Sequence, residues 1–193
     1  MNITNVSIRT VNSDSPVKAY ASVTIDGKFI FYGINIVKHK DSDNLFVTMA
    51  TREVSKGKFM EVFYHPSTRA AREQLSATVI DCYRKVIENP EVTSFDMGDP
   101  TADLHVGSIR FSSYDGVPPV RSSLLLDGDM LINMCTIQLD PKTRRYQISL
   151  PKREMKDGSL KDVYHPLNRD TRNAIANAVL AEFLNLTVRQ DPA

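Results

Sequence analysis

Hydrophobic and polar residues alternate in short runs over the first half of the chain, which is the pattern of half-buried β-strands. Residues 17–25 (VKAYASVTI) and 28–37 (KFIFYGINIV) show it most clearly, and both are rich in β-branched and aromatic types. Asp26-Gly27 lies between them and predicts a two-residue hairpin turn, because both residue types tolerate positive φ. Residues 2–11 and 45–50 predict two further strands.

A helical period follows a polar loop that contains a glycine. Apolar residues recur at i, i+4, i+7 and i+11, which places them on one helical face. They are Leu75, Val79, Cys82 and Val86. Pro66 disfavours helix in the residue before it, so we expect the helix to begin just after it, with Ser67 or Thr68 as its N-cap.

The same order of elements returns about a hundred residues later, as a duplicated domain would. TREVSKGKFMEVFYHPSTRAAR (51–72) aligns with KREMKDGSLKDVYHPLNRDTR (152–172) if Phe63 is treated as an insertion. Asp127-Gly128 repeats the hairpin turn between predicted strands at 120–126 and 129–139. The other strands predicted in this half are 104–111 and 146–151.

The second predicted helix has Asn168 or Asp170 as its N-cap and Ile175 and Val179 on its apolar face. Glu182 interrupts that face, and we expect neighbouring Phe183 to enter the core instead. The predicted fold class is therefore α+β, with two modules that each have about five antiparallel strands and a C-terminal helix over one sheet face. Module one is predicted at residues 1–88, an acidic, proline-containing linker at 89–103, and module two at 104–193.

Composition is that of a globular protein, with 41% hydrophobic and 24% charged residues among 193. No apolar run approaches the ~18 residues that a bilayer-spanning helix needs, and the polar N-terminal residues predict no signal segment. Cys82 and Cys135 occupy non-equivalent positions in the two modules, which favours buried thiols in a reducing compartment and hence a cytoplasmic protein. The formal net charge of +1 carries no nucleic-acid signal by itself.

The two His-Pro pairs are the first candidates for chemistry, because histidine titrates near neutral pH. They are His65-Pro66 and His165-Pro166. No nucleophile motif, paired cysteine motif, metal-ligand spacing or phosphate-binding glycine loop accompanies them, so we expect no enzyme, no cofactor and no metal. A structural role at the strand-to-helix junction is favoured, with a nucleic-acid contact and catalysis as the alternatives.

Basic residues gather at the predicted helix starts and in the loops before them. Arginines three residues apart share a helical face, and cations there oppose the helix dipole, so an anion such as phosphate would compensate them. A local ion pair is the alternative, with Glu73 and Asp170 adjacent and Glu61 or Asp162 in reach. The candidate nucleic-acid-binding residues are Arg52, Lys56, Lys58, Arg69 and Arg72 in module one, and Lys152, Arg153, Lys156, Arg169 and Arg172 in module two. Lys161 extends the second loop cluster. Charged loops are often simply solvated. If these loops form one basic surface with the helix starts, they could contact phosphates.

These motifs resemble the bacterial SpoVG (stage V sporulation protein G) family. The resemblance rests on the first strands NVSIR and VGSIR, the hairpins TIDGKF and LLDGDM, and the stretch LPKREMKDGSLKDVYHPLN of module two, and it covers nearly all of both modules. Module one departs from the pattern, since Ala50 replaces the expected proline, Lys56 the expected aspartate, and Phe63 is inserted.

The resemblance implies a small antiparallel sheet with a C-terminal helix, usually in a homodimer, and a regulator of septation and sporulation that binds DNA and in some cases RNA. It implies contacts by Arg52, Arg69, Arg72, Lys152, Arg153, Arg169 and Arg172. Because family members are one module long, we expect an intrachain pseudo-dimer here, and further homodimerisation of the tandem chain is possible. No membrane and no small-molecule substrate is expected. The alternative function is a protein-interaction adaptor in division or sporulation that does not touch nucleic acid.

Overall fold

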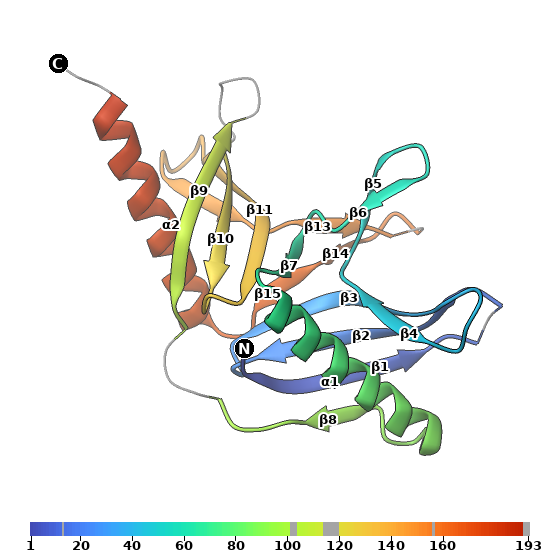
Figure 1. The fold of residues 1–193 in the computed structure, drawn as a ribbon. Helices are drawn as coiled ribbons and strands as arrows, with labels where there is room; N and C mark the ends of the chain where they lie inside the picture. The colour runs from blue at the N-terminus through green and yellow to red at the C-terminus, as the bar shows by residue number, and fades with distance from the viewer. Residues whose placement is uncertain (13, 101–103, 114–119, 156, 191–193) are drawn as a thin grey trace.

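The computed structural model of the chain describes residues 1–12, 14–100, 104–113, 120–155 and 157–190. Antiparallel sheets and two helices form two similar halves, which confirms the predicted α+β class with two modules (Figure 1). The elements of the first half are β1 (Ile3–Thr10), β2 (Val17–Ile25), β3 (Phe29–Lys38), β4 (Leu45–Thr48), β5 (Arg52–Ser55), β6 (Lys58–Met60), β7 (Tyr64–Pro66), α1 (Arg69–Glu88) and β8 (Ser94–Asp96).

The second half repeats this order, and its described residues contain no counterpart of β8. Its elements are β9 (Val106–Ser113), β10 (Val120–Leu126), β11 (Met130–Leu139), β12 (Tyr146–Ser149), β13 (Lys152–Glu154), β14 (Leu160–Asp162), β15 (Tyr164–Pro166) and α2 (Arg169–Gln190). In each half, strands one to four form the main sheet and the next two form a separate hairpin, β5–β6 or β13–β14. The predicted strands therefore exist in both halves.

Both predicted hairpin turns have the required left-handed backbone. Asp26 and Gly27 have φ of 52° and 59°, and Asp127 and Gly128 have φ of 50° and 75°. In each turn a backbone N–H closes the loop at 3.0 Å, from Lys28 to the Ile25 carbonyl and from Asp129 to the Leu126 carbonyl. Positive φ at both central residues gives the turn the twist of the flanking strands.

The helices begin and pack as the sequence predicts. The Thr68 hydroxyl accepts the Ala71 N–H at 3.1 Å, and Asn168 Oδ1 accepts the Thr171 N–H at 2.8 Å, so these two residues are the N-caps. Helix α1 packs against β1, β4 and β7, and α2 against β9, β12 and β15. The predicted apolar face of α1 is buried, and in α2 Phe183 is buried beside Ile175 and Val179 while Glu182 is only half-buried.

The two modules exchange a strand. The Tyr-His-Pro strand β7 of module one pairs with β11 of module two, and β15 of module two pairs with β3 of module one. The main sheets consequently run β15-β3-β2-β1-β8, with β4 also on β3, and β12-β11-β10-β9, with β7 also on β11. Each helix returns to its own module's sheet after the exchanged strand. The exchange makes the chain a reciprocal intrachain pseudo-dimer.

Tyrosine side chains reinforce this exchange. Tyr64 pairs its backbone with Ile132 of module two, yet its hydroxyl donates at 2.7 Å to the Tyr32 carbonyl of module one. Tyr164 does the reverse, since its backbone pairs with Phe31 and its hydroxyl donates to the Asn133 carbonyl. Both tyrosines are fully buried, so each hydroxyl needs the partner it has.

Four aromatic rings fill the seam between the modules. Phe31 lies 4.8 Å from Tyr64 and 6.1 Å from Tyr164 between ring centroids, and Phe29 lies 5.6 Å from Tyr164. All four rings are fully buried, and aromatic pairs at such distances add stability beyond their buried area. One hydrophobic core therefore runs through both modules.

Residues 89–103, expected as a linker, include the short strand β8. It pairs with β1 through Ser94↔Ser7, Phe95↔Val6 and Asp96↔Asn5. Phe95 is half-buried against the core, and Lys85 lies 5.8 Å over its ring. Part of this segment thus extends the module-one sheet.

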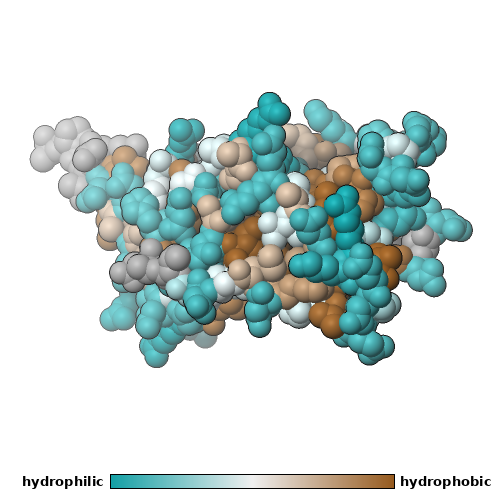
Figure 2. All heavy atoms as spheres, turned by 60° about the horizontal axis from the view of Figure 1, so that its bottom comes forward, coloured by the Kyte–Doolittle hydropathy of each residue, from teal (hydrophilic) through white to brown (hydrophobic). Residues whose placement is uncertain are grey.

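Hydrophilic side chains cover much of the face that lies at the bottom of Figure 1. Figure 2 shows that face, with hydrophobic side chains reaching the surface in separate patches between them. Among the described residues, no helix is long and apolar enough to cross a membrane.

Candidate nucleic-acid interface

The His-Pro pairs lie within the exchanged strands. His165 Nδ1 is 2.9 Å from the Pro166 carbonyl oxygen, which can only accept, so Nδ1 carries a proton; in the neutral ring Nε2 then accepts from the Tyr32 hydroxyl at 3.2 Å. Burial, with a smaller contribution from the Asp162 carboxylate, raises the pKa of Tyr32, so this hydroxyl keeps its proton. His65 is half-buried, and Asn133 takes the place of Tyr32 on the strand beside it. Both prolines are buried.

The predicted loop clusters lie on the two separate hairpins. Arg52 begins β5, Lys56 lies in the turn, and Lys58 begins β6; all three are exposed. Lys152 and Arg153 begin β13, where they pair with Asp162 and Lys161 of β14, and all four are exposed. The predicted contact Lys156 lies outside the described residues.

The helix-start arginines of module one are ion-paired. Arg69 Nε lies 2.7 Å from Glu73 Oε1, one turn later on the exposed helix surface. The Arg72 guanidinium donates twice to Glu61, at 2.6 Å and 3.2 Å, and Glu61 Oε1 also accepts the Met49 N–H at 2.9 Å.

Electrostatics fix this second pair in the charged state. Burial would raise the pKa of Glu61, but the hydrogen bonds from Arg72 and Met49 and the arginine charge outweigh it, so the pKa is lowered. The hydrogen bond to Glu61 in turn raises the pKa of Arg72. In module one the local ion pair, one of the two alternatives considered from sequence, therefore occupies both arginines.

Module two differs at the same positions. Arg169 and Arg172 are exposed, and within the described part of the chain their side chains form no hydrogen bond or ion pair. The counterpart of Glu61 is Asp162, which is one methylene shorter and exposed on β14. We call Lys152, Arg153, Arg169 and Arg172 the module-two basic face. The chain thus presents two potential phosphate-binding arginines in module two and two neutralised ones in module one.

A groove separates the β5–β6 hairpin of module one from the sheet of module two. Its volume is about 710 Å³, and both modules line it. The lining residues are Arg52, Glu53, Val54 and Val62 of module one, and Ser112, Arg121, Ser122, Ser123, Asn133 and Met134 of module two. In Figure 1 the hairpin and α2 lie on opposite sides of the β9–β11 sheet, so the groove faces away from the helix.

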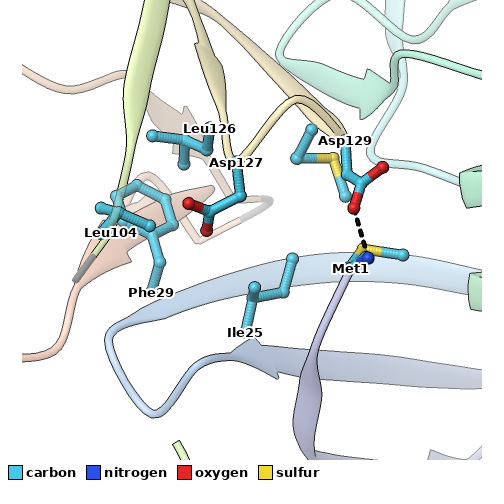
Figure 3. Close-up of a pocket in the computed structure, with 8 residues that line it drawn as sticks. Met1, Ile25, Phe29, Leu104, Leu126, Asp127 and Asp129 are labelled. Carbon is cyan, nitrogen blue, oxygen red and sulfur yellow. Dashed lines mark ion pairs between the residues drawn. The ribbon is translucent and has the colours of Figure 1, made fainter. Parts of the chain in front are cut away.

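A smaller cavity lies at the seam, where Met1, Leu104 and Phe29 meet the Asp127-Gly128 turn (Figure 3). The Met1 ammonium pairs with Asp129. Asp127 Oδ1 accepts the His105 N–H at 2.7 Å, whereas its Oδ2 is buried with no hydrogen-bond partner among the described residues. Burial, with the nearby Asp26 carboxylate of module one, raises the pKa of Asp127.

Sequence reasoning missed Arg121 and the groove, because the groove forms only after the hairpin of one module meets the sheet of the other. Arg121 lies between Val120 and Ser122 on a predicted strand, where a charged side chain is simply expected on the solvent side of the strand. No group of three His, Cys, Asp or Glu side chains suited to hold a metal occurs in the described ranges.

Two α+β modules on one chain, joined by a reciprocal strand exchange and carrying basic hairpins, define a tandem pseudo-dimer. The SpoVG family model matches residues 1–85 and 119–185, so the chain belongs to the SpoVG family. The chain is 33% identical over 92 residues to a "Putative septation protein SpoVG" of Clostridium botulinum, and 35% identical over 94 residues to the protein of that name from Brevibacillus brevis. The matches span 98% and 95% of those proteins but 48% of this chain. Each relative is therefore one module long.

Proposed function

We propose that this chain is a non-catalytic regulatory protein of septation that binds the phosphate backbone of DNA or RNA, in the cytoplasm, through the module-two basic face. The observation that carries the proposal is the pair Arg169 and Arg172, which are exposed at the start of α2 without acidic partners among the described residues. Their module-one counterparts are neutralised by Glu73 and Glu61. The septation role is taken from the names of the single-module relatives.

The geometry of the helix start supports an anion at this place. Backbone N–H groups at a helix N-terminus and arginine side chains together favour phosphate. The hairpin base adjoins the helix start, since Glu61, directly after β6, contacts Arg72 on α1, and Asp162 holds the equivalent position beside Lys152 in module two. By the same arrangement we expect the hairpin and helix cations of module two to share one side of the module.

Binding across a salt series tests the proposal. The purified chain would be titrated with labelled single-stranded RNA, single-stranded DNA and duplex DNA, beside Arg169→Ala/Arg172→Ala and the matched Arg69→Ala/Arg72→Ala. We expect the module-two variant to bind more weakly and to reduce the slope of log K against log salt by about 1.4 on single strands, from two lost phosphate contacts. The module-one variant should retain the slope. If no probe binds at low salt while circular dichroism shows a folded chain, the proposal is wrong.

A protein-interaction adaptor is the second candidate, and the hairpins favour it. Phe59 on β6 is 62% exposed and Leu160 on β14 is 64% exposed, at corresponding ends of the two hairpins. On the first hairpin Val54 and Met60 are exposed as well, and exposed apolar side chains that gather on one surface are typical of protein contacts. Binding of a partner protein through these side chains would persist at high salt and would be lost in Phe59→Ser/Leu160→Ser. Binding of nucleic-acid phosphates would instead be lost at high salt and retained in Phe59→Ser/Leu160→Ser.

A further inference from the structure

The groove between the modules combines cations, hydroxyls and apolar side chains in a way that the basic face alone does not. Arg52 comes from module one and Arg121 from module two, so neither module supplies both guanidinium groups. Among the described residues that line the groove, Glu53 carries the acidic side chain, and its Oε1 accepts the Gly57 N–H at 2.7 Å, at the turn of its own hairpin. The site is complete only in the tandem pair.

Each class of lining residue matches a part of a nucleotide. Guanidinium groups bind phosphate oxygens with two parallel hydrogen bonds. The hydroxyls of Ser112 and Ser123 and the amide of Asn133 supply donors and acceptors of the kind that contact sugars and base edges. Met134 and Val54 offer apolar contact for a base face. The groove therefore matches a polyanion with flat apolar faces better than a simple anion.

The groove suits an unpaired strand. About 710 Å³ is the size of a pocket for a small organic ligand, and an unpaired strand can place phosphate and base together in such a space. A duplex keeps its bases paired inside, so it can only touch the rim with its backbone.

Among the described residues, different side chains occupy the pseudo-symmetric position in module one. The hairpin turns Asp26-Gly27 and Asp127-Gly128 set the correspondence, which places Tyr32 where module two has Asn133 and Tyr20 where it has Arg121. The Tyr32 ring lies 5.6 Å from His165, and Tyr20 lies beneath Arg9 at 5.3 Å. Bulky aromatic rings thus replace the amide and the guanidinium.

We propose that single-stranded nucleic acid binds in this groove, with its backbone on Arg52 and Arg121 and a base against Met134, while the module-two basic face contacts single strands and duplexes alike. This inference rests on the proposed function and names the ligand form that the inter-module part of the interface selects.

Two variants separate the groove from the basic face. Asn133→Tyr fills the groove with the residue that module one has there, and its backbone carbonyl still accepts from Tyr164. Arg121→Gln removes a groove charge. Arg84→Gln on α1, outside the groove, is the charge-matched control. By fluorescence anisotropy we expect both groove variants to weaken binding of a single-stranded oligonucleotide about tenfold or more and to leave duplex binding within about twofold.

Thiol protection gives a second readout. Ser112 is exposed at the groove, while Cys82 and Cys135 are buried, and burial raises the pKa of Cys135 to about 11. In Ser112→Cys, maleimide should therefore react mainly at residue 112, and a single strand, but not a duplex, should slow that reaction.

The outcomes are distinguishable. Unchanged single-strand affinity in both folded groove variants, or equal protection by duplex, overturns the groove inference while the proposed function stands if Arg169→Ala/Arg172→Ala still loses binding. Absence of binding by the unmodified chain to every probe overturns both.

Discussion

Replacing Asp127 by asparagine should stabilise the protein at neutral pH, because the carboxylate is poorly accommodated at the seam. Asp127 points into the seam cavity (Figure 3), and its Oδ2 is buried without a partner in the described structure. Burial raises the pKa of Asp127, and the Asp26 carboxylate of the equivalent turn in module one raises it further. Asp26 already accepts the Asn2 side-chain amide at 2.7 Å. The carboxylates of Asp26 and Asp127, one from each hairpin turn, therefore repel each other, and Asp127 Oδ2 accepts no hydrogen bond from the described residues.

The asparagine removes this conflict without disturbing the turn. Its carbonyl oxygen can keep the His105 N–H, its NH₂ group can donate toward Asp26, and asparagine tolerates the φ of 50°. An unmatched buried polar group costs about 1–3 kcal/mol, and partial exposure of Asp127 places the gain at the low end, about 1 kcal/mol. For a chain of this size that is a rise in Tm of about 2–4 °C.

The pH dependence follows from the direction of the shift. The folded-state pKa of Asp127 is raised, so between the unfolded and folded pKa values the folded chain binds more protons. The stability that protonated Asp127 contributes is lost as pH rises through its folded-state pKa. The asparagine does not titrate, so the variant keeps its stability over this range. The difference between variant and parent should therefore grow from about pH 4 to neutral pH.

Thermal and urea unfolding across that pH range measure the difference. Asp81→Asn, an exposed carboxylate on α1, is the control for a general loss of negative charge. Asp26→Asn should relieve the same repulsion, so the double variant should gain less than the sum of the two single changes. An Asp127→Asn Tm equal to or below that of the parent at pH 7 would refute the reasoning.

Two further predictions test the asymmetry and the exchange. Arg72→Ala should lower the free energy of unfolding by about 1–2 kcal/mol because it leaves half-buried Glu61 unpaired, whereas Arg172→Ala should stay within about 0.5 kcal/mol in urea unfolding; equal costs would contradict the assigned ion pairing. Residues 1–88 and 104–193, produced separately, should each show little folded structure by circular dichroism and fold when mixed, because each sheet takes a strand from the other half. A stable, monomeric 1–88 fragment would count against the exchange.

Local pattern was enough to predict the elements. The Asp-Gly turns, the alternation in β2, the N-caps Thr68 and Asn168, and the entry of Phe183 instead of Glu182 into the core all follow from interactions between residues close in sequence. The duplication was equally readable, since two copies of one pattern in one chain predict two modules of one fold.

Partners distant in sequence were not predictable in the same way. The sequence Tyr64-His-Pro is the same whether its strand pairs within its own module or with the other module. The backbone N–H and C=O groups of a short strand can pair with any suitable strand edge, so they do not specify the partner. The same holds for β8, whose pairing with β1 depends on how residues 89–100 return across the sheet. For Arg69 and Arg72 the sequence allowed either a phosphate contact or a local ion pair. The side-chain geometry shows ion pairs, with Glu73 for Arg69 and with Glu61 for Arg72.

The sequence alone thus determined two α+β modules, their turns, their helix registers and the basic residues at each helix start, because these depend on periodicity and on contacts within a few residues. Tertiary structure alone decided the strand exchange, the neutralised arginines of module one and the groove that joins Arg52 to Arg121. Those features arise where the chain folds back across about a hundred residues, and there the choice among chemically similar partners depends on the packing of the whole core rather than on any local pattern.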